Sequence, residues 1–251
     1  MHDLERAEIA AFAAMFDGAP ERNHGFGVAR LGEAVCGIAR SLPGVRDLNR
    51  VCGADDATDP AEILRVYDGL EHIVAVAPGA GGLAERLATA GYTPAYAWMK
   101  FAGPADPSAH APTDLRIEAV GPDRARDFAA PVVGGFGMPD FMIDVIAGAV
   151  GRPGWTCLVA YDGDAPVSGA ALVVAGDQGW LGMGATLPEA RGRGAQSALL
   201  ATRIRLAAEA GCTTVTTETG VREEGTPGRS YRNILRAGLE EAFERPNWVS
   251  P

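Results

Sequence analysis

One stretch in the second half of the chain constrains the fold more than any other. Residues 180–187 form an apolar, glycine-containing run that is typical of a strand approached closely by another backbone or a ligand. Pro188 ends such a ladder because it has no N–H group. Residues 190–195, with the sequence ARGRGA, are too glycine-rich for regular structure. The apolar spacing of residues 198–209 then predicts a helix, which Gly211 terminates. The unit is a strand, an arginine–glycine loop and a helix.

This unit has the chemistry of an anion site. Glycines let successive backbone N–H groups turn inward, and the following helix adds its unsatisfied N-terminal amides. Arg191 and Arg193 place positive charge beside those amides. The predicted guest is a phosphate or pyrophosphate. A solvated basic loop in front of an ordinary helix is the alternative, and the clear strand and helix on either side argue against it.

The segment from Arg191 to Gln196 resembles the acetyl-CoA motif of the GNAT acetyltransferase superfamily, which reads Arg/Gln-x-x-Gly-x-Gly/Ala between a strand and a long helix. Arg191 and Gly194 match the motif, whereas Gln196 replaces its last small residue. The Gln196 side chain could crowd the pyrophosphate or hydrogen-bond to it, and both alternatives stay open here. The resemblance extends from Leu115 to Trp248, where the surrounding elements follow the family's order.

The resemblance implies acetyl-CoA as co-substrate and assigns roles to positions around the motif. In the family, backbone groups of the strand before the loop pair with the pantetheine arm, and one N–H polarises the thioester carbonyl. The positions that match this role are Gly184, Ala185 and Thr186. The positions that match the phosphate site are Arg191, Gly192, Arg193, Gly194, Ala195, Gln196 and Ser197. Asn233 is a further candidate contact to the cofactor. Gly184 is also typical of a bulge that bends the strand, and both interpretations can hold together.

The sequence offers few candidates for a general acid and a general base. An attacking amine needs a base or a water path to take its proton. The nearest carboxylate is Glu218, at the end of the strand after the helix, and a solvated or capping role is the alternative for it. The family's acid tyrosine corresponds, by spacing from Gly238, to Ile234, which cannot donate a proton. Tyr231, one turn earlier, can replace it only if the helix is rotated. All four histidines precede residue 111.

The first half of the chain repeats the element order of the second without repeating its residues. Residues 102–113, AGPADPSAHAPT, have the composition of a linker. We therefore expect an α/β fold (α+β, with mixed sheets) of two tandem GNAT-like domains, each a twisted mixed sheet flanked by helices. Their predicted bounds are residues 1–101 and 114–251.

The two halves differ at the loop that precedes the helix. In the first half this loop carries Asp55, Asp56 and Asp59 instead of arginines. A carboxylate repels a phosphate by about 1 kcal/mol at 4 Å even in water. The first half is therefore predicted to be a degenerate GNAT-like domain that does not hold CoA. An unrelated small α/β domain is the alternative.

Net charge, cysteine content and the length of apolar runs argue against several classes of partner and location. The net charge of −10 argues against nucleic acid or an anionic membrane as the main partner. Four scattered cysteines, without a CxxC pair or a metal-ligand spacing, predict reduced, buried thiols and no metal site. The N-terminal residues lack a signal-peptide core, and no run is long enough to cross a membrane. These features predict a cytoplasmic protein, and the oligomeric state is open, with a monomer plausible.

Two function classes follow. The first is an N-acetyltransferase that moves an acetyl group from acetyl-CoA to a small-molecule or peptide amine by direct attack in a ternary complex. A motif without cysteine favours that route over a covalent enzyme intermediate. The second is a non-catalytic acyl-CoA-binding or regulatory module, which the residue Ile234 favours. Residues 134–142, GGFGMPDFM, lie where the family has its acceptor lid, and they indicate an apolar or amphipathic acceptor or, equally well, core packing.

Overall fold

The computed structural model describes residues 3–17, 25–221 and 228–251, and these fall into two compact units. The first unit holds the described residues up to Lys100, those from Glu218 to Val221, and those from Glu241 onward. The second holds Phe101–Thr217 and the described residues from Gly228 to Glu240. Each unit has its own core and is described by itself.

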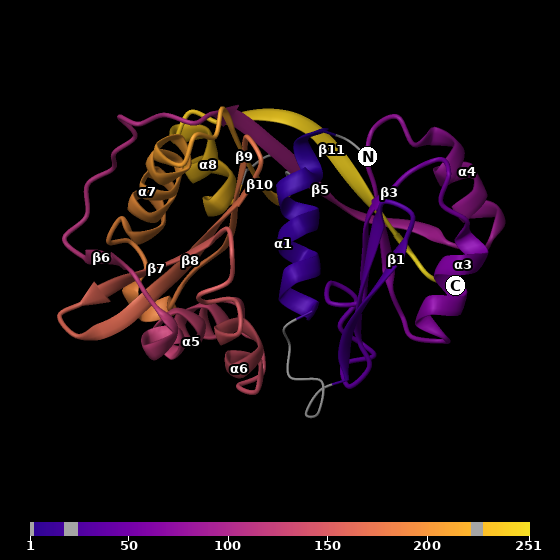
Figure 1. The fold of residues 1–251 in the computed structure, drawn as a ribbon, viewed down its shortest axis with the longest axis horizontal. Helices are drawn as coiled ribbons and strands as arrows, with labels where there is room; N and C mark the ends of the chain where they lie inside the picture. The colour runs from indigo at the N-terminus through magenta and orange to yellow at the C-terminus, as the bar shows by residue number, and fades with distance from the viewer. Residues whose placement is uncertain (1–2, 18–24, 222–227) are drawn as a thin grey trace. The chain divides into compact units, whose positions relative to one another are not determined.

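The first unit is a group of strands with helices on both faces. Its elements are η1 (Asp3–Glu5), α1 (Arg6–Asp17), β1 (Phe26–Leu31), β2 (Ala34–Ala39), β3 (Arg50–Ala54), α3 (Pro60–Tyr67), β4 (Ile73–Val76), α4 (Gly81–Thr89) and most of β5 (Thr93–Pro104). The last strand of the chain, β11 (Glu240–Val249), joins them by pairing antiparallel with β4. Figure 1 shows α1 on one face of these strands and α3 and α4 on the other.

Local sequence explains the helices of this unit. Asp59 is the N-cap of α3, as predicted, and its carboxylate accepts the Ala61 N–H at 2.9 Å, while Pro60 takes the first helical position. The fully buried positions of α3 and α4 repeat every four residues, and they are Ile63, Tyr67, Leu83 and Leu87. Since this spacing keeps them on one face of each helix, each side chain packs on the strands and stabilises the unit by about 1.5–3 kcal/mol.

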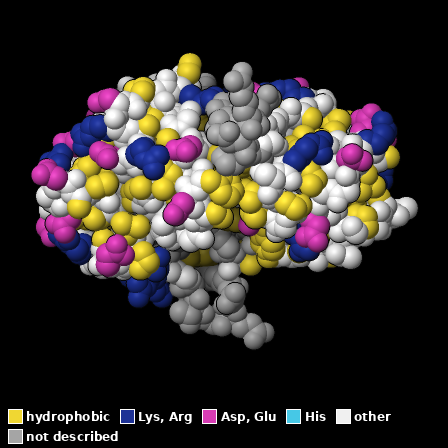
Figure 2. Space-filling view, turned by 90° about the horizontal axis from the view of Figure 1, so that it is seen from below, with side chains coloured by type: hydrophobic (Ala, Val, Ile, Leu, Met, Phe, Trp, Pro, Cys, Tyr) yellow, Lys and Arg dark blue, Asp and Glu magenta, His cyan; other side chains and the backbone are white. Residues whose placement is uncertain are grey.

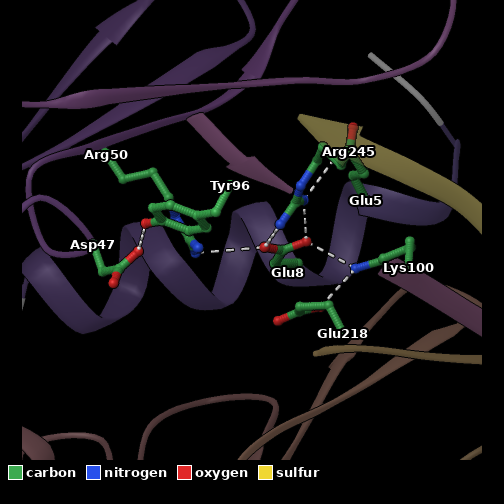
Figure 3. Close-up of polar contacts among 8 residues, drawn as sticks. All are labelled: Glu5, Glu8, Asp47, Arg50, Tyr96, Lys100, Glu218 and Arg245. Atoms are coloured by element: carbon green, nitrogen blue, oxygen red, sulfur yellow. Dashed lines mark hydrogen bonds and ion pairs between the residues drawn. The ribbon is translucent and has the colours of Figure 1, made fainter. Parts of the chain in front are cut away.

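A buried ion network surrounds Glu8 of α1 (Figure 3). Its Oε2 accepts from Lys100 Nζ at 2.8 Å and from Arg245 Nη1 at 2.6 Å. Its Oε1 accepts from Arg245 Nη2 at 2.8 Å and from Arg50 Nη2 at 3.4 Å. Arg245 also donates to Glu5 at 2.6 Å. The network therefore joins α1 to β3, β5 and β11 through side chains that are shielded from water.

The second unit contains the arginine–glycine loop. Its elements are β6 (Arg116–Ala119), η2 (Pro122–Arg124), α5 (Ala125–Phe136), α6 (Met142–Ala147), β7 (Trp155–Asp162), β8 (Ala165–Ala175), β9 (Gln178–Thr186), η3 (Pro188–Ala190), α7 (Ala195–Glu209), most of β10 (Thr214–Gly220) and α8 (Arg229–Arg236). Strands β6 to β9 pair antiparallel in sequence order, and β9 pairs parallel with β10. Gly169 of β8 lets α5 approach closely, because a Cβ there would lie 2.7 Å from Val132. Ala195 and Leu199 of α7 belong to a core cluster with residues of β7 and β8.

The strands follow the order β1-β2-β3-β4-β11-β5-β10-β9-β8-β7-β6, in which β5 and β10 extend into both units. The fold is thus α+β, with one mixed sheet of 11 strands flanked by helices. Two observations differ from the predicted division of the chain. Residues 102–104, expected in the linker, continue β5, and β11, expected in the second domain, lies almost entirely in the first unit. Both differences arise from long-range strand pairing.

On the face drawn in Figure 2, basic side chains occur singly or in small groups among acidic ones. No helix among the described residues is long and apolar enough to cross a bilayer.

Candidate functional site

The end of β9 departs from regular strand geometry. Gly169 of β8 pairs with Ala185, and Ala171 pairs with Gly182, so that Met183 and Gly184 lie opposite Ala170 alone. Met183 has a φ of +55°, in the left-handed region that few side chains adopt. These are the features of a β-bulge, which the sequence proposed for Gly184. The parallel ladder of β9 with β10 covers only residues 178–180 of β9, so the bulge lies beyond it.

The helix after the loop begins without a side-chain cap. Gly194 stands at the N-cap of α7 with a φ of +81°, and no side chain bonds to the first amides. The first intrahelical hydrogen bond of α7 runs from Ala198 N–H to Gly194 O, at 3.0 Å. The amides of Ala195, Gln196 and Ser197 are therefore the unsatisfied N-terminal donors of a 15-residue helix. Such a helix end attracts an anion by about 0.3–1 kcal/mol at an exposed site.

These elements border a cavity of about 1050 Å³ within the second unit. Its lining residues come from the end of α5, from β9, from the loop with the start of α7, and from α8, and they are Gly135, Phe136, Gly184, Thr186, Ala190, Arg191, Gly192, Gly194, Ala195, Gln196, Ser197, Arg229, Ser230, Arg232, Asn233 and Arg236. The charged members are four arginines, and none of these described lining residues is acidic. The cavity is therefore built for an anionic ligand.

Most predicted cofactor positions lie at this cavity, with two exceptions. Ala185 does not line it, and its carbonyl accepts from Ser168 Oγ at 2.7 Å. The Arg193 guanidinium donates to Asp162 at 2.5 Å and to Asp114 at 2.7 Å, and these hydrogen bonds lower the pKa of both carboxyl groups. The Arg193 side chain is thus committed to ion pairs instead of projecting freely beside the amides, as the sequence predicted.

The Gln196 side chain bonds to neighbouring strands, and the two alternatives for its role toward a pyrophosphate stay predictions. Its Nε2 donates to Thr186 Oγ1 at 2.9 Å and to Ser168 Oγ at 3.3 Å. Its Oε1 lies 3.0 Å from the place that a Cβ on Gly184 would take. The side chain therefore bridges α7 to β8 and β9 at the edge of the cavity.

Neither predicted acid–base residue lines the cavity. Glu218 Oε2 accepts from Lys100 Nζ at 3.0 Å, and both residues belong to the first unit. Tyr231 is only 1% exposed, and its ring packs edge-on against Phe101 with centroids 4.8 Å apart. Glu218 thus forms an ion pair and Tyr231 packs in a core, and their roles as base and acid stay predictions.

Three arginines of α8 and one buried arginine of α7 were not predicted from the sequence. Arg229, Arg232 and Arg236 of α8 all line the cavity, and their spacing of three and four residues, typical of one helical face, was the available signal. Arg203 is buried in α7, four residues after Leu199 and four before Ala207. An arginine within that apolar stripe was the signal for it. The predicted lid contributes Gly135 and Phe136, which is 54% exposed.

Comparison with known proteins agrees with this geometry. Residues 125–223, from α5 to beyond β10, match the family model of the acetyltransferase (GNAT) domain, Acetyltransf_6. The chain thus contains a GNAT acetyltransferase domain over these residues. No curated protein is detectably similar to the chain.

Solved structures extend the similarity of fold. A GCN5-related N-acetyltransferase from Kribbella flavida is 18% identical, with a TM-score of 0.64 over 100% of this chain and 97% of that one. A GCN5-related N-acetyltransferase from Sphaerobacter thermophilus is 15% identical, with a TM-score of 0.61 over 97% and 93%. A tandem GNAT protein from the clavulanic acid biosynthesis pathway is 17% identical, with a TM-score of 0.55 over 75% and 66%. At these identities the similarity shows a shared GNAT-like fold over the full chain.

Proposed function

We propose that the second unit binds acetyl-CoA in this cavity and transfers the acetyl group to an amine by direct attack in a ternary complex. One observation supports the proposal above all others. The start of α7 has no side-chain cap, and it borders the same cavity as four arginines. Coenzyme A carries a pyrophosphate and a further phosphate. Helix amides and arginine forks are the groups that bind such anions most strongly.

In this proposal the amides of Ala195, Gln196 and Ser197, with Arg191 and the α8 arginines, hold the phosphates. Among the described residues, the Arg191 side chain has only long hydrogen bonds of 3.4 Å, to Thr186 O and Gly135 O, so it can turn to a phosphate at little cost. The bulge at Gly184 and the backbone up to Thr186 meet the pantetheine arm and the thioester. Asn233, across the cavity on α8, is a further contact.

The chemical step follows from this placement. The amine nitrogen attacks the thioester carbonyl carbon, the carbonyl oxygen gains negative charge, and the C–S bond then breaks to release the CoA thiolate. No cysteine lines the cavity, and all four are buried, which favours direct attack over an acyl-enzyme. The described lining holds no carboxylate, histidine or tyrosine, so the amine proton leaves to water, and water also solvates the thiolate.

We further propose that the first unit is a degenerate GNAT-like domain without a CoA site. Asp59 caps α3, Asp55 Oδ1 accepts from Ala57 N–H at 3.0 Å, and Asp56 Oδ1 accepts from Leu83 N–H at 2.7 Å in the first turn of α4. Carboxylates thus already occupy backbone donors that a phosphate would need. One acetyl-CoA site per chain is the consequence.

A non-catalytic acyl-CoA-binding module is the second candidate. The observation that favours it is the same lack of an acid or base among the described lining residues. The two candidates share the binding step and differ in turnover.

Calorimetric titration with acetyl-CoA, followed by a CoA-release assay with a panel of amines, tests both. We expect one site per chain. Arg232→Ala should weaken binding about tenfold or more, since a hydrogen bond to a charged group is worth about 1.5–3 kcal/mol. Arg205→Ala, which removes an arginine paired with Glu209 outside this cavity, is the matched control. Two sites per chain would contradict the degenerate first unit, and binding without amine-dependent CoA release would favour the non-catalytic module.

A further inference from the structure

Arg203 is a buried cation for which the described residues provide no carboxylate partner. Its side chain belongs to α7 and is only 3% exposed. Burying a charge without a counter-charge is strongly unfavourable. Burial accordingly lowers the pKa of the guanidinium, although an arginine remains protonated at neutral pH. A cost of this size at one position calls for a role that an apolar residue could not fill.

The hydrogen bonds of Arg203 converge on the bulge. Its Nε donates to Leu199 O at 3.1 Å, which fixes the side chain against its own helix. Its Nη1 donates to Ala171 O at 3.2 Å and to Gly182 O at 3.0 Å. Ala171 and Gly182 are the paired residues at which the β8–β9 register shifts. One guanidinium group therefore connects both strands at the base of the bulge.

The second terminal nitrogen of Arg203 lies beside the cavity wall. Its Nη2 is 3.4 Å from the position that a Cβ on Gly184 would take, and Gly184 lines the cavity. Gln196 Oε1 lies 3.0 Å from the same position, so the Gln196 amide and the Arg203 guanidinium both face Gly184. The positive charge thus stands next to the strand segment that meets the thioester in the proposed function.

We propose that Arg203 is a positioning residue for acyl transfer, which holds the β9 bulge through Ala171 and Gly182 and keeps a permanent positive charge beside Gly184 to polarise the thioester carbonyl. The inference rests on the proposed function. It names a residue that the acetyl-CoA motif, from Arg191 to Gln196, does not contain.

The physical argument concerns charge that develops during the reaction. As the amine attacks, the carbonyl oxygen becomes negative, and a buried cation that is held in place stabilises that charge without reorganising. Arginine suits this task better than lysine, because its planar guanidinium bonds three carbonyls through Nε and Nη1 and still presents Nη2. A neutral side chain of the same length would leave the carbonyls of Ala171 and Gly182 without their donor.

Infrared spectroscopy of bound acetyl-CoA tests the inference. The probe is acetyl-CoA with a ¹³C label at the thioester carbonyl, compared free and bound to the wild type, Arg203→Met, Arg203→Lys and the control Arg205→Met. We expect the carbonyl band to move to lower frequency on binding to the wild type and to the control. That displacement should be lost in Arg203→Met and partly kept in Arg203→Lys, which retains the charge without the fork.

An unchanged displacement in Arg203→Met would overturn the inference, because a residue that only packs does not act on the carbonyl band. Thermal melting shows which variants fold. If Arg203→Met does not fold, Arg203→Lys decides: a reduced displacement supports the role, and a wild-type displacement overturns it. A wild type that binds acetyl-CoA without any displacement also overturns it. Failure of the wild type to bind acetyl-CoA at all would instead contradict the proposed function, and this inference with it.

Discussion

Gln196 donates its side-chain amide to Thr186 Oγ1 at 2.9 Å, and this bond joins the first turn of α7 to the end of β9. The acceptor hydroxyl also lies 2.8 Å from Ser168 Oγ, whose side chain is fully buried. The residue that departs from the acetyl-CoA motif has thus become a cross-link between the two elements that border the cavity.

Replacing Gln196 by alanine should therefore affect stability more than cofactor binding. Loss of one net hydrogen bond predicts a decrease of about 1 kcal/mol in the free energy of unfolding. Affinity for acetyl-CoA should stay within about threefold, which corresponds to less than 1 kcal/mol. Denaturant titration and calorimetry measure the two quantities. A large loss of affinity with unchanged stability would show that Gln196 turns to the cofactor after all.

Alanine at Gly194 should impair the loop more than alanine at Gly192. Both glycines have left-handed φ angles, +81° and +91°, so either substitution costs roughly 1–2 kcal/mol of backbone strain. At Gly194 the new Cβ would also lie 2.8 Å from Pro112 O, whereas nothing lies within 4 Å at Gly192. Acetyl-CoA affinity and melting temperature should both fall further in Gly194→Ala. Equal losses of affinity and melting temperature in the two variants would show that the contact with Pro112 O contributes nothing to the effect.

Tyr231→Phe should leave turnover close to that of the wild type, within about twofold, if the chain is an acetyltransferase. A residue that is 1% exposed and packed on Phe101 does not reach a thiolate in the cavity, and general-acid help would be worth about 10²–10⁴-fold. The CoA-release assay measures it at saturating acetyl-CoA. A loss of tenfold or more, at unchanged melting temperature, would restore the acid role that the sequence predicted for Tyr231.

The sequence predicted those parts of the site that local chemistry determines. The residues that end the strand and bound the helix are local signals, namely Pro188, Gly194 and Gly211. The bounds predicted for the strand and the helix therefore lie within a few residues of those of β9 and α7. The direction of a side chain depends on residues far away in the sequence. Arg193 turns to Asp114 and Asp162, which are 79 and 31 positions distant, and no local pattern contains that information.

Acid should destabilise the first unit through Glu8. Burial alone raises the pKa of this carboxyl, but the charges of Arg245 and Lys100 outweigh burial and lower its pKa well below the usual range. A glutamate in the unfolded chain titrates at about 4.3. The stability that Glu8 contributes is therefore fully present above that pH and is lost as the pH falls through the lower pKa of the folded state.

Glu8→Gln should lose about 3–5 kcal/mol at neutral pH, because it leaves the cations around it short of one counter-charge. Its free energy of unfolding should also fall less steeply with acid than that of the wild type. Urea denaturation at a series of pH values measures both effects. Glu85→Gln, at an exposed position of α4, is the matched control and should retain the wild-type profile. Parallel profiles for Glu8→Gln and the wild type would show that other carboxyl groups govern the acid response.

The pairing of β11 with β4 has a consequence for how the chain is made. Val74 and Trp248 are register partners in the first unit, yet roughly two-thirds of the chain separates them. During synthesis the edge of β4 that pairs with β11 therefore stays unpaired until β11 has been made. At about 5–20 residues per second this interval is on the order of ten seconds or more. An unpaired edge invites association with other nascent chains over that interval. The nascent first unit acquires β11 only after that strand has been synthesised, and fragments truncated before Asn247 are expected to aggregate instead of folding.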